Sequence, residues 1–292
     1  MAKNKEEYMY DTTMKIGNSK IQHGSQNNRI YLMDLDKEDM PGILNTIDCM
    51  ANTYGYTKIF AKVPNCFSKL FLEEGYAEEA TVPGFFNGKE DCIFMGKYRD
   101  KERSLPVDQG LNKKVIDNAL LKQPKNSVKF NGLDHNLPRT FSFKKAERSD
   151  AHKMAYLYAK VFDSYPVPIF DPEYIKKTIG EDVVYFTIWK GQELVALSAG
   201  EMYIGDASVE MTDFAVLPEY RGYNFSYFLL TQMEKEMRKR EIKTAYTIAR
   251  STSYAINSTF AKCGYGFAGI LVKNTQIAGK IEDMNVWFKS LA

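Results

Sequence analysis

The stretch Glu210–Arg240, which reads EMTDFAVLPEYRGYNFSYFLLTQMEKEMRKR, decides how the rest of the chain is interpreted. It predicts an apolar strand, a short turn that opens at Pro218, and then an amphipathic helix. A turn of small or turn-prone residues that leads directly into a helix presents free backbone N–H groups and the positive end of the helix dipole. Such a helix start binds anions, and we expect its ligand to be a phosphate group.

Further strands and helices are predicted on both sides of this stretch. Alternating apolar residues and short turns predict three antiparallel strands at Val183–Trp189, Glu193–Tyr203 and Ser208–Val216. A strand at Thr244–Ala249 and a helix at Tyr254–Cys263 are expected to follow. This order predicts an α+β fold, in which helices flank a mixed, largely antiparallel central sheet.

Two domains are expected in a chain of 292 residues. Residues 99–139 are rich in Lys, Asp, Asn, Gln and Pro, which is typical of a linker, and they carry one predicted helix at Asp108–Lys122. We therefore divide the chain into residues 1–138, the smaller domain with the linker, and residues 139–292.

A short internal repeat relates these two parts. Ile59–Gly75 and Ile248–Gly264 each predict a strand and a helix, with Phe four positions before the Gly and Tyr directly after it. Self-similarity of this kind indicates two related half-folds. The first copy has no counterpart of Arg221–Ser226, so only the second half is expected to bind the anion.

Local signals predict several boundaries. Asp36 precedes apolar residues at helical spacing that end at Gly55, and Ser149 precedes another such run, so both are predicted helix caps. Asn87-Gly88 predicts a hairpin turn. Tyr165–Pro172 contains three prolines and is predicted to be an ordered loop.

The amino-acid composition excludes few classes of protein and favours no unusual one. Lys and Arg number 39 against 37 Asp and Glu, a formal charge of +2, so nothing favours a nucleic acid or membrane partner. No apolar run approaches the length of a membrane helix, and a soluble, cytoplasmic protein is expected. The cysteines and histidines lack ligand spacing, so we expect no metal site and no disulfide framework, with the cysteines as small buried side chains. These cysteines are Cys49, Cys66, Cys92 and Cys263.

Two segments of the second part resemble a known family. They are FAVLPEYRGYNFSYFLL at 214–230 and ARSTSYAINSTFAKCGYGFAG at 249–269. Together with the element order over residues 139–292, they resemble the GNAT family of acyl-CoA-dependent N-acetyltransferases. Its phosphate turn carries Arg or Gln, two residues, Gly, one residue, and Gly or Ala. Arg221 fits, while Asn224 and Ser226 replace the small pair, a mild departure because Asn tolerates left-handed backbone and Ser is small.

Three more segments narrow the resemblance. VPGFFNGKEDCIFMGKY at 82–98, FDSYPVPIFDPEYI at 162–175 and KNTQIAGKIEDMNVWFKSL at 273–291 are similar to the bacterial and archaeal beta-lysine N-acetyltransferases. This similarity spans nearly the whole chain. It implies an acetyl-CoA-dependent transferase that acetylates the side-chain amine of beta-lysine and so makes a neutral compatible solute for osmoadaptation. No metal is implied.

The resemblance also implies a cosubstrate site in the second part. The backbone after Arg221 would take the pyrophosphate, the strand before it would receive the pantetheine as an added strand, and one of its N–H groups would polarise the thioester. Asn257 would lie beside the pantetheine arm. The expected acetyl-CoA-binding residues are Phe214, Ala215, Val216, Arg221, Gly222, Tyr223, Asn224, Phe225, Ser226 and Asn257.

Glu210 is the expected general base, because an alkyl ammonium with a pKa of about 10.4 is rarely neutral at pH 7. Simple alternation puts Glu210 on the face opposite Val209 and Met211, although a plain surface glutamate on a strand fits the same pattern. Asp213 has the other parity unless a bulge intervenes, and it is a candidate for holding the substrate's ammonium. Arg250 and Lys177 are unplaced candidates for a substrate carboxylate.

The leaving thiolate is where the family pattern fails. Members of the family often carry Tyr where this chain has Phe260, so water or another Tyr must supply the proton. Two alternatives therefore stay open: acetylation of another small cationic amine or of a protein lysine, and a non-catalytic CoA-binding module. Residues 1–138 are expected to form a structural or dimer-forming lid, and a homodimer is possible.

Overall fold

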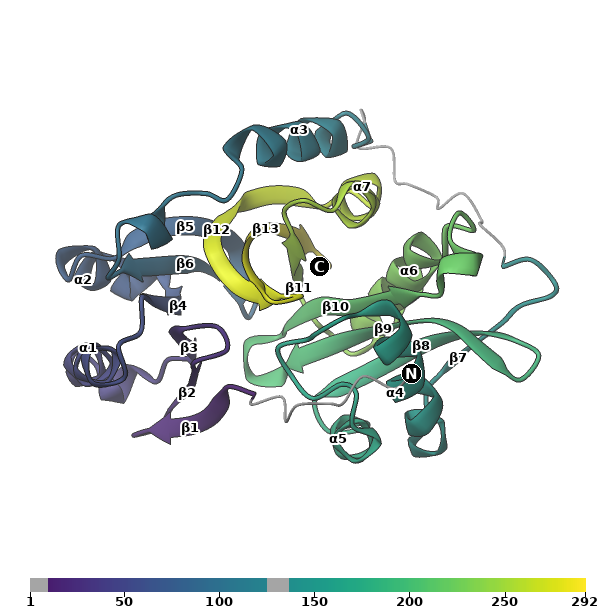
Figure 1. Cartoon of the computed structure of the whole chain (residues 1–292), viewed down its shortest axis with the longest axis horizontal. Coiled ribbons are helices and arrows are strands. Elements are labelled where there is room, and N and C mark those ends of the chain that lie inside the picture. Colours follow the sequence, from purple (N-terminus) through teal and green to yellow (C-terminus); the bar gives the residue numbers. More distant parts are fainter. Residues whose placement is uncertain (1–9, 125–136) are drawn as a thin grey trace.

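The structure of the chain, a computed structural model, describes residues 10–124 and 137–292. Within them, thirteen strands form one continuous sheet with helices on its faces (Figure 1). The strands are β1 (Thr12–Ile16), β2 (Ser19–Gly24), β3 (Arg29–Asp34), β4 (Lys58–Pro64), β5 (Ala77–Phe86), β6 (Glu90–Tyr98), β7 (Ser142–Lys145), β8 (Val183–Lys190), β9 (Glu193–Tyr203), β10 (Ser208–Val216), β11 (Thr244–Arg250), β12 (Gly266–Ile277) and β13 (Lys280–Ser290). The helices are α1 (Gly42–Tyr54), α2 (Ser68–Glu73), α3 (Gln109–Leu120), α4 (Ala151–Val161), α5 (Pro172–Thr178), α6 (Phe225–Lys239) and α7 (Tyr254–Lys262). The predicted α+β class is confirmed.

The two ends of the sheet repeat one arrangement. The strand order is β1-β2-β3-β4-β6-β5-β12-β13-β11-β10-β9-β8-β7. In the first half β3 is parallel to β4, and β4, β6 and β5 then pair antiparallel. In the second half β10, β11, β13 and β12 follow the same rule. Since α1 and α6 connect the matching parallel strands, the repeat predicted from Ile59–Gly75 and Ile248–Gly264 is present in the topology.

The halves also share an apolar core. Separate clusters lie under α1, under α6 and α7, and under α4 and α5. A further cluster combines Phe85 and Phe94 of the first half with Tyr246 and Val286 of the second. The ring centroid of Tyr246 lies 5.3 Å from that of Phe85 and 5.8 Å from that of Phe94. The first half therefore packs directly against β11, one of the two strands that flank the expected acyl site.

Backbone pairing alone holds the two halves weakly where they meet. β5 pairs with β12 at one position, Ala80 with Gly269. Gly269 has φ +151°, and a Cβ there would stand 2.1 Å from the carbonyl oxygen of Glu79, so only glycine permits this approach. Directly after it, the register of β12 with β13 shifts between Leu271 and Thr275, which leaves backbone groups of β12 for other partners.

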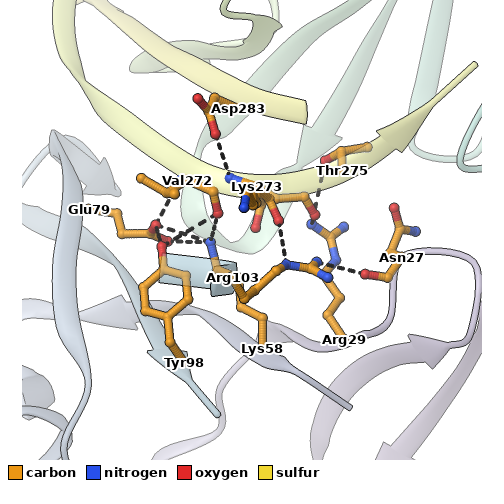
Figure 2. A network of polar contacts seen from close by, with 11 residues as sticks. Asn27, Arg29, Lys58, Glu79, Tyr98, Arg103, Val272, Lys273, Thr275 and Asp283 are labelled. Carbon is orange, nitrogen blue, oxygen red and sulfur yellow. Dashed lines mark hydrogen bonds and ion pairs between the residues drawn. The ribbon is translucent and has the colours of Figure 1, made fainter. Parts of the chain in front are cut away.

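Side chains from the first half supply those partners (Figure 2). The Lys58 ammonium donates to the Val272 carbonyl over 2.8 Å, and Glu79 accepts from the Val272 N–H over 2.8 Å. Arg103 donates through Nε to the Lys273 carbonyl over 2.9 Å, and Arg29 donates to the next carbonyl. Lys58 and Glu79 also form an ion pair of 2.8 Å with side chains 0% and 5% exposed. This seam is a buried polar network rather than a regular ladder.

The helix predicted in the linker packs on the second half. The helix expected at Asp108–Lys122 is α3, and Asp108 caps it by accepting a hydrogen bond from the Leu111 N–H. Ala119 belongs to the core under α6 and α7, and Lys122 donates to Ser258 of α7 over 2.9 Å. Figure 1 shows α3 lying beside α7. Residues 125–136 of the predicted linker lie outside the described residues.

Two predicted helix starts are wrong. Asp36 caps only the short 3-10 turn Lys37–Asp39, and α1 begins at Gly42. Ser149 does not cap α4, because it lies inside the 3-10 turn Arg148–Asp150 that precedes this helix. In the capping box of that turn, the side chains of Glu147 and Asp150 each accept from the other's backbone N–H. The loop at Tyr165–Pro172 is present, and α5 begins at its last residue.

Candidate active site

The predicted anion turn has the backbone that its sequence requires. Gly222 has φ +92° and Asn224 has φ +58°, both in the left-handed region that Gly and Asn tolerate. Asn224 is the N-cap of α6 without a side-chain bond to the helix, and the first turn of α6 carries no acidic residue. Free N–H groups and the positive dipole end therefore meet no internal anion, which suits a phosphate ligand.

The turn lines a cleft of about 1070 Å³. Arg221, Gly222, Asn224, Phe225 and Ser226 line it. Of the other cosubstrate-binding residues expected, Phe214 and Val216 also line the cleft, whereas Ala215 and Asn257 are fully buried and Tyr223 stacks on Phe225 outside the lining.

The cleft exists because β10 and β11 separate. These parallel strands pair only from Ser208–Glu210 to Thr244–Tyr246, although both continue beyond those residues. Beyond this pairing the two strands diverge. Most residues of Thr212–Val216 on β10, and all of Thr247–Arg250 on β11, line the cleft between them. An open edge of a strand offers backbone donors and acceptors to an extended ligand. Glu210 and Tyr246 stand where the two strands part.

A β-bulge turns Asp213 into the cleft. The register of β10 with β9 shifts between Thr212 and Ala215, and Asp213 has φ +58°. This bulge is the condition under which the sequence allowed Asp213 to share the site with Glu210. The Asp213 carboxylate accepts hydrogen bonds from the hydroxyl groups of Tyr165 and Thr212.

Glu210 faces away from the core under α6, as alternation predicts. Val209 and Met211 are fully buried in that core, whereas Glu210 is half-buried on the other face. Glu210 is paired in register with Glu201 of β9, and it accepts a hydrogen bond of 3.1 Å from the Tyr246 hydroxyl. Glu201, Glu210 and Asp213 thus form a cluster of three carboxylic acids.

Burial makes these acids weak. Burial and the charges of Asp213 and Glu210 raise the pKa of Glu201 to about 8. Burial raises the pKa of Glu210 to about 7, opposed by the charge of Lys62 and the Tyr246 hydrogen bond, and it raises the pKa of Asp213 to about 6. A carboxylate whose pKa lies near neutrality can accept a proton from an amine and release it again. The cluster also suits a cationic ligand, which would restore its ionised form.

Replacing Glu201 by glutamine should stabilise the ligand-free protein at alkaline pH. Its pKa is raised from 4.5 to about 8 on folding, so its cost to stability is absent below the lower value and complete above the higher one. We expect Glu201→Gln to gain about 1–3 kcal/mol near pH 9 and little near pH 4, measured by urea unfolding. The exposed Glu193, on the same strand, provides the control Glu193→Gln. Lower stability of Glu201→Gln near pH 9 would contradict this account.

The structure corrects the expected role of Asn257. Its side-chain amide is 0% exposed, and it donates to the carbonyls of Arg250 and Ser253. Its Oδ1 accepts from Asn285 and from the indole of Trp287. All four hydrogen-bonding positions are taken, so Asn257 supports the cleft wall from behind and does not contact a ligand in it.

The structure also shows where Phe260, Arg250 and Lys177 lie. Phe260 is buried against Phe214 and does not reach the cleft. Arg250 lines the cleft but is held by both carboxylate oxygens of Glu282, at 2.8 and 2.7 Å, and Lys177 is exposed on α5. Among the described residues, neither Arg250 nor Lys177 forms a hydrogen bond or ion pair with Glu201, Glu210 or Asp213.

Sequence reasoning missed three residues of the site region. Tyr165 lines the cleft from the proline-rich loop, Glu201 pairs with Glu210 from β9, and Lys62 comes from β4 of the first half. Alternation along β9 could have indicated Glu201, which interrupts a buried apolar strand. No local signal indicates Lys62 or Tyr165, because each reaches the cluster only through the fold.

The sequence also led to expectations about metal sites, membrane helices and cysteines. Among the described residues, no group of three or more His, Cys, Asp or Glu side chains is arranged to hold a metal ion. None of the described helices has the length and apolarity needed to cross a bilayer. The four cysteines are free, but Cys49 and Cys66 are exposed, so the expectation that all are buried is wrong for these two. His135 lies outside the described residues.

Known proteins resemble this chain over most of its length. A family model described as Acetyltransferase (GNAT) family matches residues 151–265. A Beta-lysine N(6)-acetyltransferase from Methanococcus maripaludis is 39% identical over 94% of this chain and 97% of its own length. The enzyme with the same description from Methanosarcina mazei is 31% identical over 74% of this chain and 85% of its own. N-acetyltransferase YodP from Bacillus subtilis is 32% identical over 78% of each chain.

Proposed function

Because this chain belongs to the acetyltransferase (GNAT) family and takes its acyl group from acetyl-CoA, we propose that it acetylates the N(6) amine of β-lysine. The assignment of β-lysine as substrate rests on similarity over nearly the full length to an enzyme described as a Beta-lysine N(6)-acetyltransferase. The cluster of three carboxylic acids beside the cleft supports it. Acetylation removes one positive charge, so the product has no net charge. The proposal places this reaction in the cytoplasm and makes the product a compatible solute.

The cleft offers acetyl-CoA a helix N-terminus and an open strand edge. The first turn of α6 would bind the pyrophosphate through backbone N–H groups, and the exposed Arg221 would add its charge. The open edge of β10 after Glu210 would hold the pantetheine arm, and an N–H group near the Asp213 bulge would polarise the thioester carbonyl. When bound, acetyl-CoA supplies an activated acetyl group.

A negative charge in the first turn of α6 should weaken acetyl-CoA binding without weakening the fold. We expect Ser226→Glu to raise the KM for acetyl-CoA by about 10–100-fold, because it repels the pyrophosphate and competes for the same N–H groups. The same carboxylate should stabilise the helix by about 0.3–1 kcal/mol, since it interacts favourably with the dipole. Kinetics and urea unfolding measure the two effects.

The neutral variant Ser226→Gln is the matched control, because it has the same size without the charge. If both variants raise the KM equally, the cause is steric and the phosphates need not lie at this helix. If neither variant does, the phosphates bind elsewhere.

Glu210 is the proposed general base, acting directly or through water. With its pKa near 7, it is partly ionised at neutral pH and can take the proton that the ammonium must lose before attack. Asp213 would hold the substrate amine on the cleft side of Glu210, oriented by the Tyr165 and Thr212 hydroxyl groups. Burial and Asp213 raise the pKa of Tyr165, so this phenol keeps its proton. Water or another tyrosine of the cleft then supplies the proton to the thiolate, in place of the phenol that Phe260 lacks.

Free-thiol release from acetyl-CoA with a panel of amines tests the proposal. We expect turnover with β-lysine well above that with lysine, polyamines or a lysine-containing peptide. Turnover confined to the peptide would favour a protein acetyltransferase. Tight binding of acetyl-CoA with no turnover on any amine would favour a CoA-binding regulatory module.

A further inference from the structure

Lys62 is a buried cation that the reaction so far does not use. It lies on β4 of the first half, on the same face as Lys58, and is 3% exposed. No carboxylate or carbonyl oxygen of the described residues accepts a hydrogen bond from its ammonium, whose polar neighbour is Tyr203. Lys58, four positions earlier, is likewise buried but is fully engaged by Glu79 and the Val272 carbonyl. An ammonium buried without a carboxylate or carbonyl acceptor costs free energy, and a ligand that supplies an acceptor would offset this cost.

The surroundings of Lys62 hold the cation in place but leave its donors unused. Its ammonium lies 3.7 Å from the ring centroid of Tyr203, and the rings of Tyr31 and Phe85 are 5.9 and 5.6 Å away. Ring faces attract a cation without accepting conventional N–H hydrogen bonds. The site is thus pre-organised for an acceptor that the described residues do not provide.

Lys62 is electrostatically part of the acidic cluster. Its charge lowers the pKa of both Glu201 and Glu210, which lie on β9 and β10 of the second half. No ion pair within 4 Å joins it to either glutamate among the described residues. Glu201, Tyr203 and Glu210 are only half-buried, so part of each side chain is accessible from solvent.

We propose that Lys62 binds the carboxylate of the amino-acid substrate, so that the first half selects an amino acid over a simple polyamine. This inference rests on the proposed function. β-Lysine carries two ammonium groups and one carboxylate, and the region combines three acids with one unpaired cation. With the N(6) amine at Glu210 and Asp213, the carboxylate lies at the far end of the molecule, where Lys62 can donate to it. Glu201 is then available for the second ammonium.

The test compares β-lysine with β-lysine amide and with decarboxylated β-lysine, using the full-length enzyme near pH 9. At this pH Glu210 is ionised in the wild-type enzyme, since its pKa is raised only to about 7. We expect Lys62→Met to lower kcat/KM for β-lysine by about 10–100-fold, mainly through KM, as the loss of one charge-assisted hydrogen bond predicts. Its kcat/KM for the two compounds without a carboxylate should stay unchanged or rise.

Two controls separate recognition from support of the fold. Lys289→Met removes another cation that contacts an aromatic ring, but one paired with Glu234 outside the cleft, and it should leave the preference among the three amines unchanged. Lys62→Arg keeps the charge and should keep part of the preference for β-lysine. Stabilisation against heat by β-lysine but not by its amide gives a binding readout that needs no turnover.

An equal loss of kcat/KM for all three amines in Lys62→Met would overturn the inference and leave the proposed function standing. Lys62 would then only tune Glu210 or support the packing. A wild-type enzyme that acetylates other amines but not β-lysine would overturn the proposed function and this inference with it.

Discussion

Replacing Glu210 by glutamine is expected to lower kcat/KM for the amine by about 10²–10⁴-fold at pH 7. The reason is the supply of neutral amine, since an ammonium with a pKa of about 10.4 is neutral in only about one molecule in a few thousand at this pH. Glutamine keeps the size of the side chain and can still accept from the Tyr246 hydroxyl, so the geometry where β10 and β11 part should persist.

The pH profile distinguishes a base from a positioning residue. In the wild-type enzyme, kcat/KM should rise through about pH 7 as Glu210 ionises, since its pKa is raised to about 7. In Glu210→Gln that rise should be absent, and activity should recover only as the free amine deprotonates near about pH 10. Steady-state kinetics over this range, with Glu193→Gln as control, measure both. A constant loss at every pH would reduce Glu210 to positioning the amine.

Removing Glu79 is expected to cost about 3–5 kcal/mol of unfolding free energy, the largest stability effect we predict. Lys58 is fully buried, and burial lowers its pKa to about 8 against the opposing effect of Glu79. Glu79→Ala leaves this ammonium with the Val272 carbonyl alone, and it also removes the acceptor of the Val272 N–H and of the Tyr98 hydroxyl.

Urea unfolding of three variants tests the seam. Glu79→Ala should lose most, whereas Lys58→Met combined with Glu79→Leu should recover part of the loss, because no unpaired charge stays buried. Asp117→Ala breaks an exposed ion pair with Lys113, at 2.7 Å and with side chains 56% and 76% exposed, and should change stability by about 0–1 kcal/mol. Equal losses for Glu79→Ala and Asp117→Ala would show that the seam does not depend on this pair.

Glu210→Gln tests the site in the second half of the sheet, and Glu79→Ala tests the contact between the two halves. Four strands in each half share one order, β3-β4-β6-β5 and β10-β11-β13-β12, but among the described residues only the second half carries the turn Arg221–Ser226 before its helix. The first half has instead become part of the site's surroundings, through Phe85 and Phe94 against Tyr246 and through Lys62 beside the acids. The first half was expected to form a structural lid, but its side chains also pack beside the acidic cluster.

Local sequence determined much of the second half. Strand alternation placed Glu210 opposite Val209 and Met211, and Gly222 and Asn224 gave the turn before α6, because these signals act between near neighbours along the chain. The matching strand-helix units also indicated the repeat. Asp213 could be placed only conditionally, since a bulge depends on how β10 pairs with β9.

The sequence by itself determined the face of Glu210 and the turn before α6, because short periodic patterns and turn chemistry encode them. The family and the acyl donor followed from the resemblance of several segments to known acetyltransferases. Only the tertiary structure decided which distant residues join Glu210: Glu201 from β9, Tyr165 from the proline-rich loop, and Lys62 from the other half. It also removed Asn257 from the cleft, since its bonds to Asn285 and Trp287 arise only when β13 lies beside β11. Such contacts follow from strand order and sheet pairing, which no local pattern records.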